Sequence, residues 1–193
     1  MSHCYFITHP EVTIDPDVPV HRWGLSDQGR ERMSAFSAHP FLANVKRVIS
    51  SEELKAVEAA NLLAARLGQQ PARMASLGEN DRTATGYLPK AQFEAAADEF
   101  FAHPDRSYRG WETATAAQAR IVATIEQILR ASPDVDIAIV SHGAVGTLLK
   151  CFLKGIAITR TEDQTRQGHY FVFETDSRKL LLDWTPLESP WIV

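Results

Sequence analysis

Two hydrophobic patterns alternate along most of this chain. Short continuous apolar runs, such as residues 4–8 and 136–141, are followed by longer segments in which apolar positions recur at helical spacing. Continuous apolar runs are typical of strands buried on both faces, and strands separated by helices usually join in parallel. The pattern therefore predicts a three-layer α/β/α fold, with a mainly parallel central sheet and helices on both faces.

Six predicted strands share a high apolar content and end at polar or turn-forming residues. They cover 4–8, 45–51, 71–77, 136–141, 169–174 and 179–184. The last two alternate moderately around a turn-forming segment at 175–178, which indicates a terminal hairpin or two adjacent edge strands.

Helical spacing is recognisable in five segments between these strands. They run from Ser26 to His39, from Glu53 to Gly68, and over 91–102, 114–131 and 144–154. Ser26 is the predicted N-cap of the first helix. Ser50 and Glu53 have the spacing of a capping box at the start of the second. The polar segments 10–24 and 78–89 have no periodicity, and loops of this length in compact domains are usually functional.

Two of the predicted strands end in histidine. The strand at 136–141 continues into Ser141-His142-Gly143, and the first strand into Thr8-His9-Pro10. In open α/β sheets the ligand crevice lies at the carboxyl ends of the strands. We therefore expect the two strands to be neighbours and His9 and His142 to meet at one site.

Composition limits the classes of partner. A length of 193 residues suits a single domain spanning 1–193, and 45% hydrophobic with 23% charged residues is ordinary for a soluble protein. The net charge is −4 without a block of like charges, which argues against a nucleic-acid partner. The sequence lacks a signal segment and a membrane-length apolar run, so we expect no membrane partner. Cys4 and Cys151 lie in apolar runs and indicate buried thiols in a reducing, cytoplasmic compartment.

Apolar residues also gather near the C-terminus. They would cover a sheet edge or form a homodimer contact, and they comprise Trp184, Trp191, Ile192 and Val193. The sequence does not decide between these two roles.

Six short motifs follow one another along nearly the whole chain. They are 6–9, 23–29, 48–60, 77–79, 110–113 with Arg120 further along the helix, and 140–143. In this order and spacing they resemble the histidine phosphatase superfamily, also called phosphoglycerate mutase-like. The resemblance implies the three-layer fold and a metal-independent phosphatase that needs no cofactor and acts on a small phosphorylated molecule.

The resemblance also implies roles for three side chains. His9 would attack phosphorus and form a phosphohistidine intermediate. His142 would hold the phosphoryl oxygens. Glu79 would give a proton to the leaving-group oxygen and later take one from water, which requires a raised pKa.

Two motifs depart from the family's pattern. The first motif, Arg-His-Gly in the family, is Thr8-His9-Pro10 here, and Lys55 replaces the second phosphate-binding arginine. Arginine binds phosphate with a planar fork, whereas lysine offers a point charge and threonine only a hydroxyl. We expect Thr8, Lys55 and a compensating cation to contact the substrate. Arg22, in the loop after the first strand, is the first candidate for that cation, ahead of Arg82 and Arg109.

Three other hypotheses remain. The chain would be a non-catalytic module that binds a phosphorylated or other anionic ligand on the same fold, or, less favoured, a phosphoglycerate mutase. A hydrolytic metal site built from His9, His142 and Glu79 lacks the usual ligand spacing. Glu112 and Thr113 are expected to begin a helix, and Arg120 to be structural.

Overall fold

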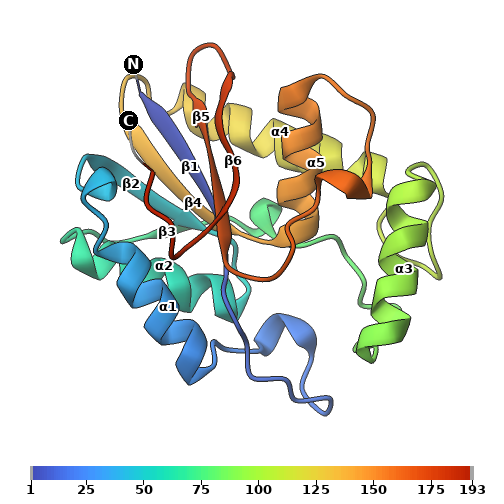
Figure 1. Cartoon of the computed structure of the whole chain (residues 1–193). Helices are drawn as coiled ribbons and strands as arrows, with labels where there is room; N and C mark the ends of the chain where they lie inside the picture. Colours follow the sequence, from blue (N-terminus) through green and yellow to red (C-terminus); the bar gives the residue numbers. More distant parts are fainter. Residues whose placement is uncertain (1, 192–193) are drawn as a thin grey trace.

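One six-stranded sheet runs through the middle of the computed structural model, which describes residues 2–191 (Figure 1). The strands are β1 His3–Thr8, β2 Val45–Ser50, β3 Ala72–Arg73, β4 Asp136–Ser141, β5 His169–Glu174 and β6 Leu180–Pro186. Their spatial order is β3-β2-β4-β1-β5-β6. The first four are mutually parallel, and β5 and β6 are antiparallel to their neighbours. The predicted mainly parallel sheet is confirmed.

Helices cover both faces of the sheet (Figure 1). They are α1 Asp27–Ser37, α2 Leu54–Arg66, α3 Lys90–Ala102, α4 Ala114–Arg130 and α5 Gly143–Lys154. Residues of α1 and α2 pack against Tyr5, Ile7 and other side chains of one sheet face. Residues of α3, α4 and α5 pack against Phe6, Ile139 and the opposite face. Alternate residues of β1 therefore enter two different cores, which is why this strand is apolar throughout.

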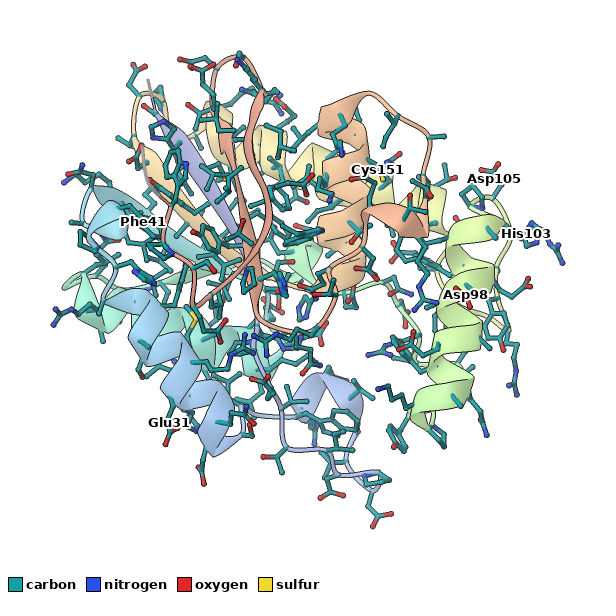
Figure 2. All side chains as sticks on the ribbon, in the orientation of Figure 1. Glu31, Phe41, Asp98, His103, Asp105 and Cys151 are labelled. Atoms are coloured by element: carbon teal, nitrogen blue, oxygen red, sulfur yellow. The ribbon has the colours of Figure 1, made fainter. Side chains whose placement is uncertain are left out.

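The outer faces of the helices carry charge. Glu31 on α1 and Asp98 on α3 are exposed, as is His103 at the end of α3 (Figure 2). Within residues 2–191, no helix has the length and apolarity needed to cross a membrane. Cys4 and Cys151 are free and buried, as the apolar runs around them predict.

Local boundaries differ from the prediction at two places. The strand expected over 71–77 is reduced to Ala72–Arg73, and a 3-10 turn follows at Ala75–Leu77. The two C-terminal strands do form a hairpin, but β5 lies inside the sheet, between β1 and β6. Its side chains are almost wholly buried, and an edge strand would leave one backbone side unpaired.

One helix cap is confirmed and one is wrong. The Ser26 hydroxyl accepts a hydrogen bond from the Gly29 amide at the start of α1. The capping box between Ser50 and Glu53 does not form, because Ser50 donates to the Ser51 carbonyl oxygen. Glu53 occupies the N-cap position of α2 without capping it, and its carboxylate turns elsewhere.

The apolar residues near the C-terminus cover the sheet where the structure describes them. Trp184 on β6 packs edge-on against Phe171, with ring centroids 4.8 Å apart. Trp191 packs edge-on against His3 at 5.1 Å and against Tyr5 at 5.8 Å. Ile192 and Val193 lie outside the described residues.

Candidate active site

Two histidines meet at the carboxyl end of the central strands. β1 and β4 are paired in parallel with Thr8 opposite Ser141, so the next residue of each strand is a histidine. The ring centroids of His9 and His142 are 5.2 Å apart and the rings are inclined by 65°. The expectation that these two distant residues meet here is confirmed. His9 is 7% exposed and His142 is fully buried.

The His9 ring is fixed by its own backbone neighbourhood. Its Nδ1 lies 2.9 Å from the carbonyl oxygen of Pro10, and because a carbonyl only accepts, Nδ1 carries the proton. The other ring nitrogen, Nε2, makes no hydrogen bond within the described chain. It is not among the buried polar atoms that lack a partner, so its lone pair is accessible to a ligand. Burial, followed by the charge of Lys55, lowers the pKa of His9 to about 4. His9 is therefore neutral near pH 7.

His142 is held from one side. Its Nε2 lies 2.7 Å from the Ser51 hydroxyl and 3.4 Å from Oε1 of Glu53. Its Nδ1 is buried and has no hydrogen-bond partner in residues 2–191. Burial lowers the pKa of His142 well below its ordinary value, against the opposing charge of Glu53. An unpaired buried nitrogen costs about 1–3 kcal/mol, so this side of the ring is prepared for a ligand.

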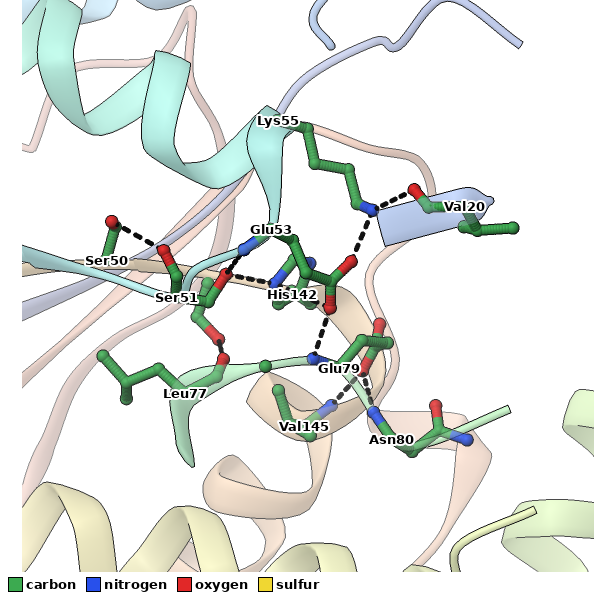
Figure 3. A network of polar contacts seen from close by, with 12 residues as sticks. Val20, Ser50, Ser51, Glu53, Lys55, Leu77, Glu79, Asn80, His142 and Val145 are labelled. Atoms are coloured by element: carbon green, nitrogen blue, oxygen red, sulfur yellow. Dashed lines mark hydrogen bonds and ion pairs between the residues drawn. The ribbon is translucent and has the colours of Figure 1, made fainter. Parts of the chain in front are cut away.

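Glu53 lies at the centre of the polar network (Figure 3). Its Oε2 accepts a hydrogen bond from Lys55 Nζ at 2.5 Å, and its Oε1 accepts one from the Glu79 amide at 2.9 Å. Burial opposes ionisation of this carboxyl. The charge of Lys55 and the hydrogen bonds from Lys55 and from the Glu79 amide outweigh it and hold its pKa well below the ordinary value. Glu53 is therefore an ionised group inside the proposed anion pocket.

Lys55 is buried but already paired. It is 4% exposed, and besides Glu53 its ammonium donates to the carbonyl oxygen of Val20 at 2.9 Å. The lysine that replaces a phosphate-binding arginine therefore ties helix α2 to the loop after β1. Its charge is neutralised by Glu53.

The structure places the two other expected binding residues differently. Thr8 is fully buried, and its hydroxyl donates to Gln164 Oε1 at 2.7 Å and accepts from the His169 amide at 3.0 Å. This hydroxyl joins β1 to the start of β5. Arg22 is exposed in the 3-10 turn Val20–Arg22, and its guanidinium has no polar partner in the described chain.

Glu79 reaches the start of α5, directly beyond His142. Its carboxylate accepts hydrogen bonds from the amides of Ala144 at 3.2 Å and Val145 at 3.0 Å, and from its neighbour Asn80 at 3.2 Å. Burial raises the pKa of this carboxyl above its ordinary value, although the charge of Arg82 opposes the rise. The two amides at the helix N-terminus favour the ionised form and oppose the effect of burial.

Arg120 holds the loop that carries Glu79. Its guanidinium donates to the carbonyl oxygens of Ser76, Gly78 and Glu79, at 2.8, 2.9 and 3.2 Å. The same group forms a two-pronged ion pair with Glu112. Arg120 therefore has the expected structural role, because it fixes the backbone of the loop beside the site. Thr113 caps α4, as expected.

A cavity of about 670 Å³ opens beside Glu53 and Glu79, the two carboxylates of this network. Glu53 and Glu79 lie at its wall, and the loops after β1 and after Leu77 form the rest. Its lining comprises residues 16–21, Glu53, 79–83, Gly86 and Tyr87. His9, His142 and Arg22 do not line it. Glu53 both lines the cavity and contacts His142, so its carboxylate connects the cavity to the histidine pair.

Two site residues are missed or ranked too low by the sequence reasoning. The sequence pattern assigns Glu53 to a helix cap, although its place in the motif between Ser51 and Lys55 is a usable signal. Arg82 ranks behind Arg22 in that reasoning, yet it lines the cavity and its guanidinium carbon lies 4.7 Å above the Phe93 ring. Among residues 2–191, no three His, Cys, Asp or Glu side chains are grouped so that they would hold a metal ion.

Comparisons with known proteins identify a family and a fold. The family model of the histidine phosphatase superfamily (branch 1) matches residues 12–183, a range that begins after His9. No curated protein sequence matches the chain.

Three solved structures illustrate the likeness in fold. A mycobacterial glucosyl-3-phosphoglycerate phosphatase bound to inorganic phosphate is 17% identical, with a TM-score of 0.79 over 98% of this chain and 100% of that one. YhfR of Bacillus stearothermophilus is 16% identical, with a TM-score of 0.81 over 97% and 100%. Phosphoserine phosphatase of Entamoeba histolytica, in complex with 3-phosphoglyceric acid, is 15% identical, with a TM-score of 0.73 over 96% and 97%.

Proposed function

The chain belongs to the histidine phosphatase superfamily, and on that premise we propose that it hydrolyses a small phosphomonoester through a phosphohistidine on His9. The observation that carries the proposal is the state of the His9 ring. Its Nδ1–H is committed to the Pro10 carbonyl oxygen, its Nε2 lone pair is open, and its pKa of about 4 keeps it neutral. A neutral imidazole with a free nitrogen is the form that attacks phosphorus.

In the first step, Nε2 of His9 forms a bond to phosphorus while the bond from phosphorus to the ester oxygen breaks. The carboxyl of Glu79 gives its proton to the departing oxygen, for which its raised pKa is suited. The unpaired Nδ1 of His142 binds a phosphoryl oxygen as a donor, once Ser51 donates to Nε2 of that ring.

In the second step, water attacks the phosphohistidine. The Glu79 carboxylate accepts a proton from that water as the water oxygen bonds to phosphorus. The N–P bond breaks, its electron pair returns to Nε2 of His9, and inorganic phosphate leaves. His9 and protonated Glu79 are restored. No cofactor takes part in this scheme.

Cations for the phosphoryl group come from two elements in this proposal. Lys55 supplies one after phosphate displaces Glu53 from it. Arg82 supplies the other, and we place it ahead of Arg22 because it lines the cavity. Thr8 acts at one remove, by holding Gln164 and the start of β5.

A second function is favoured by one specific observation. Lys55 is paired with Glu53 at 2.5 Å, so this pair carries little net charge with which to stabilise a reacting phosphoryl group. A chain of this kind would bind a phosphorylated or other anionic ligand without turning it over. The two free, buried thiols support a reducing, cytoplasmic setting for either function.

The test is an assay with p-nitrophenyl phosphate, with and without a chelator, on the wild type, His9→Ala and His103→Ala. His103 is exposed at the end of α3 and serves as the matched histidine control. We expect chelator-insensitive turnover that is lost only in His9→Ala, and an acid-labile phosphate adduct on His9 in the wild type. Binding of phosphate without turnover or adduct establishes the second function. Equal rates in all three proteins exclude His9 as the nucleophile.

A further inference from the structure

The cavity beside Glu53 and Glu79 is the space into which the alcohol part of a substrate extends, if the proposed function holds. Its volume of about 670 Å³ exceeds what a phosphoryl group alone needs. Apolar side chains make much of its wall, and they comprise Pro16, Val18, Pro19, Val20 and Tyr87. Tyr87 is supported by Trp23, with ring centroids 5.6 Å apart. The wall is thus formed by the two loops that carry no periodicity in the sequence.

Charge in this cavity is distributed unevenly. Four acidic side chains line it, and they are Asp17, Glu53, Glu79 and Asp81. Among residues 2–191, Arg82 is the one lysine or arginine in the lining, and His21 is the remaining basic group. A carboxylate or second phosphate on the alcohol part would therefore enter a region where acidic groups outnumber basic ones.

Arg82 belongs to the phosphoryl end of the cavity. Its charge acts on His9, on His142 and on Glu79, which are the groups that surround the reacting phosphorus in the proposed mechanism. Its guanidinium packs over Phe93 and has no ion pair within the described part of the chain. The cation is consequently free for the phosphoryl oxygens.

The two remaining aspartates lie where the alcohol part extends. Asp17 and Asp81 are both exposed and neither contacts a basic side chain in residues 2–191. The Asp81 carboxylate accepts hydrogen bonds from the amide and hydroxyl of Thr83, at 2.9 and 2.7 Å. These bonds lower the pKa of Asp81, so its negative charge persists across neutral pH.

We propose that the substrate is a phosphomonoester of an apolar alcohol that carries no second anionic group, and that Asp17 and Asp81 reject substrates that do. This inference rests on the proposed phosphatase function. It names a class that the apolar wall accepts, and it assigns the two aspartates as specificity determinants by charge repulsion.

Three alkyl phosphates of similar size and similar leaving group test the proposal: propyl phosphate, 2-aminoethyl phosphate and 2-carboxyethyl phosphate. We expect kcat/KM for the carboxylated ester to be lower than for propyl phosphate by roughly fivefold or more, the effect of a like charge at about 4 Å in water. By the same argument, the amine is expected to react at least as well as propyl phosphate, because the aspartates attract its positive charge. The gap should narrow as salt is raised, because exposed charges are screened.

Variants then assign the effect to residues. In Asp17→Asn/Asp81→Asn, the ratio of kcat/KM between propyl and carboxyethyl phosphate should fall by roughly fivefold. The control Asp105→Asn/Asp134→Asn changes two exposed aspartates outside the cavity lining and should leave the ratio as it is. The amide that replaces the Asp81 carboxylate retains an acceptor for Thr83, and equal melting temperatures of the variants verify folding.

The outcomes separate the two proposals. Equal turnover of the three esters, a preference for the carboxylated one, or an unaltered ratio in Asp17→Asn/Asp81→Asn overturns the substrate class and leaves the phosphatase function standing. Absence of turnover with every ester, including p-nitrophenyl phosphate, overturns both.

Discussion

Replacing Glu53 by Gln should make the pocket bind phosphate more tightly. Glu53 is the ionised group that neutralises Lys55 and lies 3.4 Å from His142. A phosphoryl group that binds Lys55 must first displace this carboxylate. Gln keeps the shape and an acceptor for the Glu79 amide, but it removes the negative charge.

The size of the gain follows from the bond that phosphate no longer has to break. A hydrogen bond to a charged group contributes about 1.5–3 kcal/mol, and each 1.4 kcal/mol is a factor of ten in affinity. The dissociation constant for phosphate should therefore fall by about 10- to 150-fold at most. Because the single carbonyl oxygen of Gln accepts from the Glu79 amide, its NH2 group faces Lys55 and the bond from Lys55 is lost, so the full range applies.

The same substitution should cost stability. Lys55 is 4% exposed, and a buried cation that loses its counter-ion destabilises a protein by about 3–5 kcal/mol, less here because the Val20 carbonyl still accepts from it. Added phosphate supplies a new anion and should restore stability by mass action. The melting temperature of Glu53→Gln should consequently rise more with phosphate than that of the wild type.

Titration calorimetry with inorganic phosphate and thermal unfolding with and without phosphate measure both effects. Glu52→Gln is the matched control, because Glu52 is exposed and adjacent. Glu52→Gln should behave as the wild type. Equal or weaker phosphate binding by a folded Glu53→Gln protein would show that Glu53 does not compete for the anion site, and the reasoning would be refuted.

Three further predictions concern the residues around this site. The His9 C2 proton should titrate near pH 4 by NMR instead of 6.5. Because the pKa of His9 is lower in the folded state than in the unfolded state, the contribution of His9 to stability is complete above pH 6.5 and is lost as the pH falls toward 4. The free energy of unfolding of His9→Asn should therefore decrease less over that pH range. A His9 that titrates at 6.5 would contradict the burial argument. Thr8→Val leaves the His169 amide unpaired and should lower the free energy of unfolding by about 1–3 kcal/mol in a denaturant titration. Gly29→Ala would put a Cβ 2.1 Å from the Glu11 carbonyl oxygen and should cost about 1–3 kcal/mol; an unchanged unfolding midpoint would contradict that contact.

Most of the fold is accessible from the sequence because burial leaves a mark on composition. β1 and β4 are buried on both faces, so their apolar runs are uninterrupted and their ends are sharp. The boundary errors have a tertiary origin. Ser50 and Glu53 have the spacing of a cap, but the carboxylate gains more from Lys55 and from the Glu79 amide, 26 positions away. Nothing local in the sequence records that competition.

The site is accessible only in part for the same reason. His9 and His142 follow strand ends, and parallel pairing is enough to bring them together. The choice between Arg22 and Arg82 depends on how two aperiodic loops fold. A loop sequence without periodicity does not indicate which side chains face the site. Thr8 is expected at the substrate because the residue before His9 carries the arginine in the family. Its small side chain is instead satisfied within the sheet end.

The charges around the two histidines show that the effect of Thr8 or of Lys55 on phosphate binding depends on the neighbouring charged groups. Both imidazoles have lowered pKa values and are neutral near pH 7, and Thr8 adds no charge. Lys55 and Glu53 cancel, so the positive charge available to a phosphoryl group rests on Arg82 until the Glu53 carboxylate moves. A phosphatase and an anion-binding module on this framework differ in how readily that carboxylate is displaced. We therefore expect the position of the Glu53 carboxylate to matter more for the function than the replacement of either arginine.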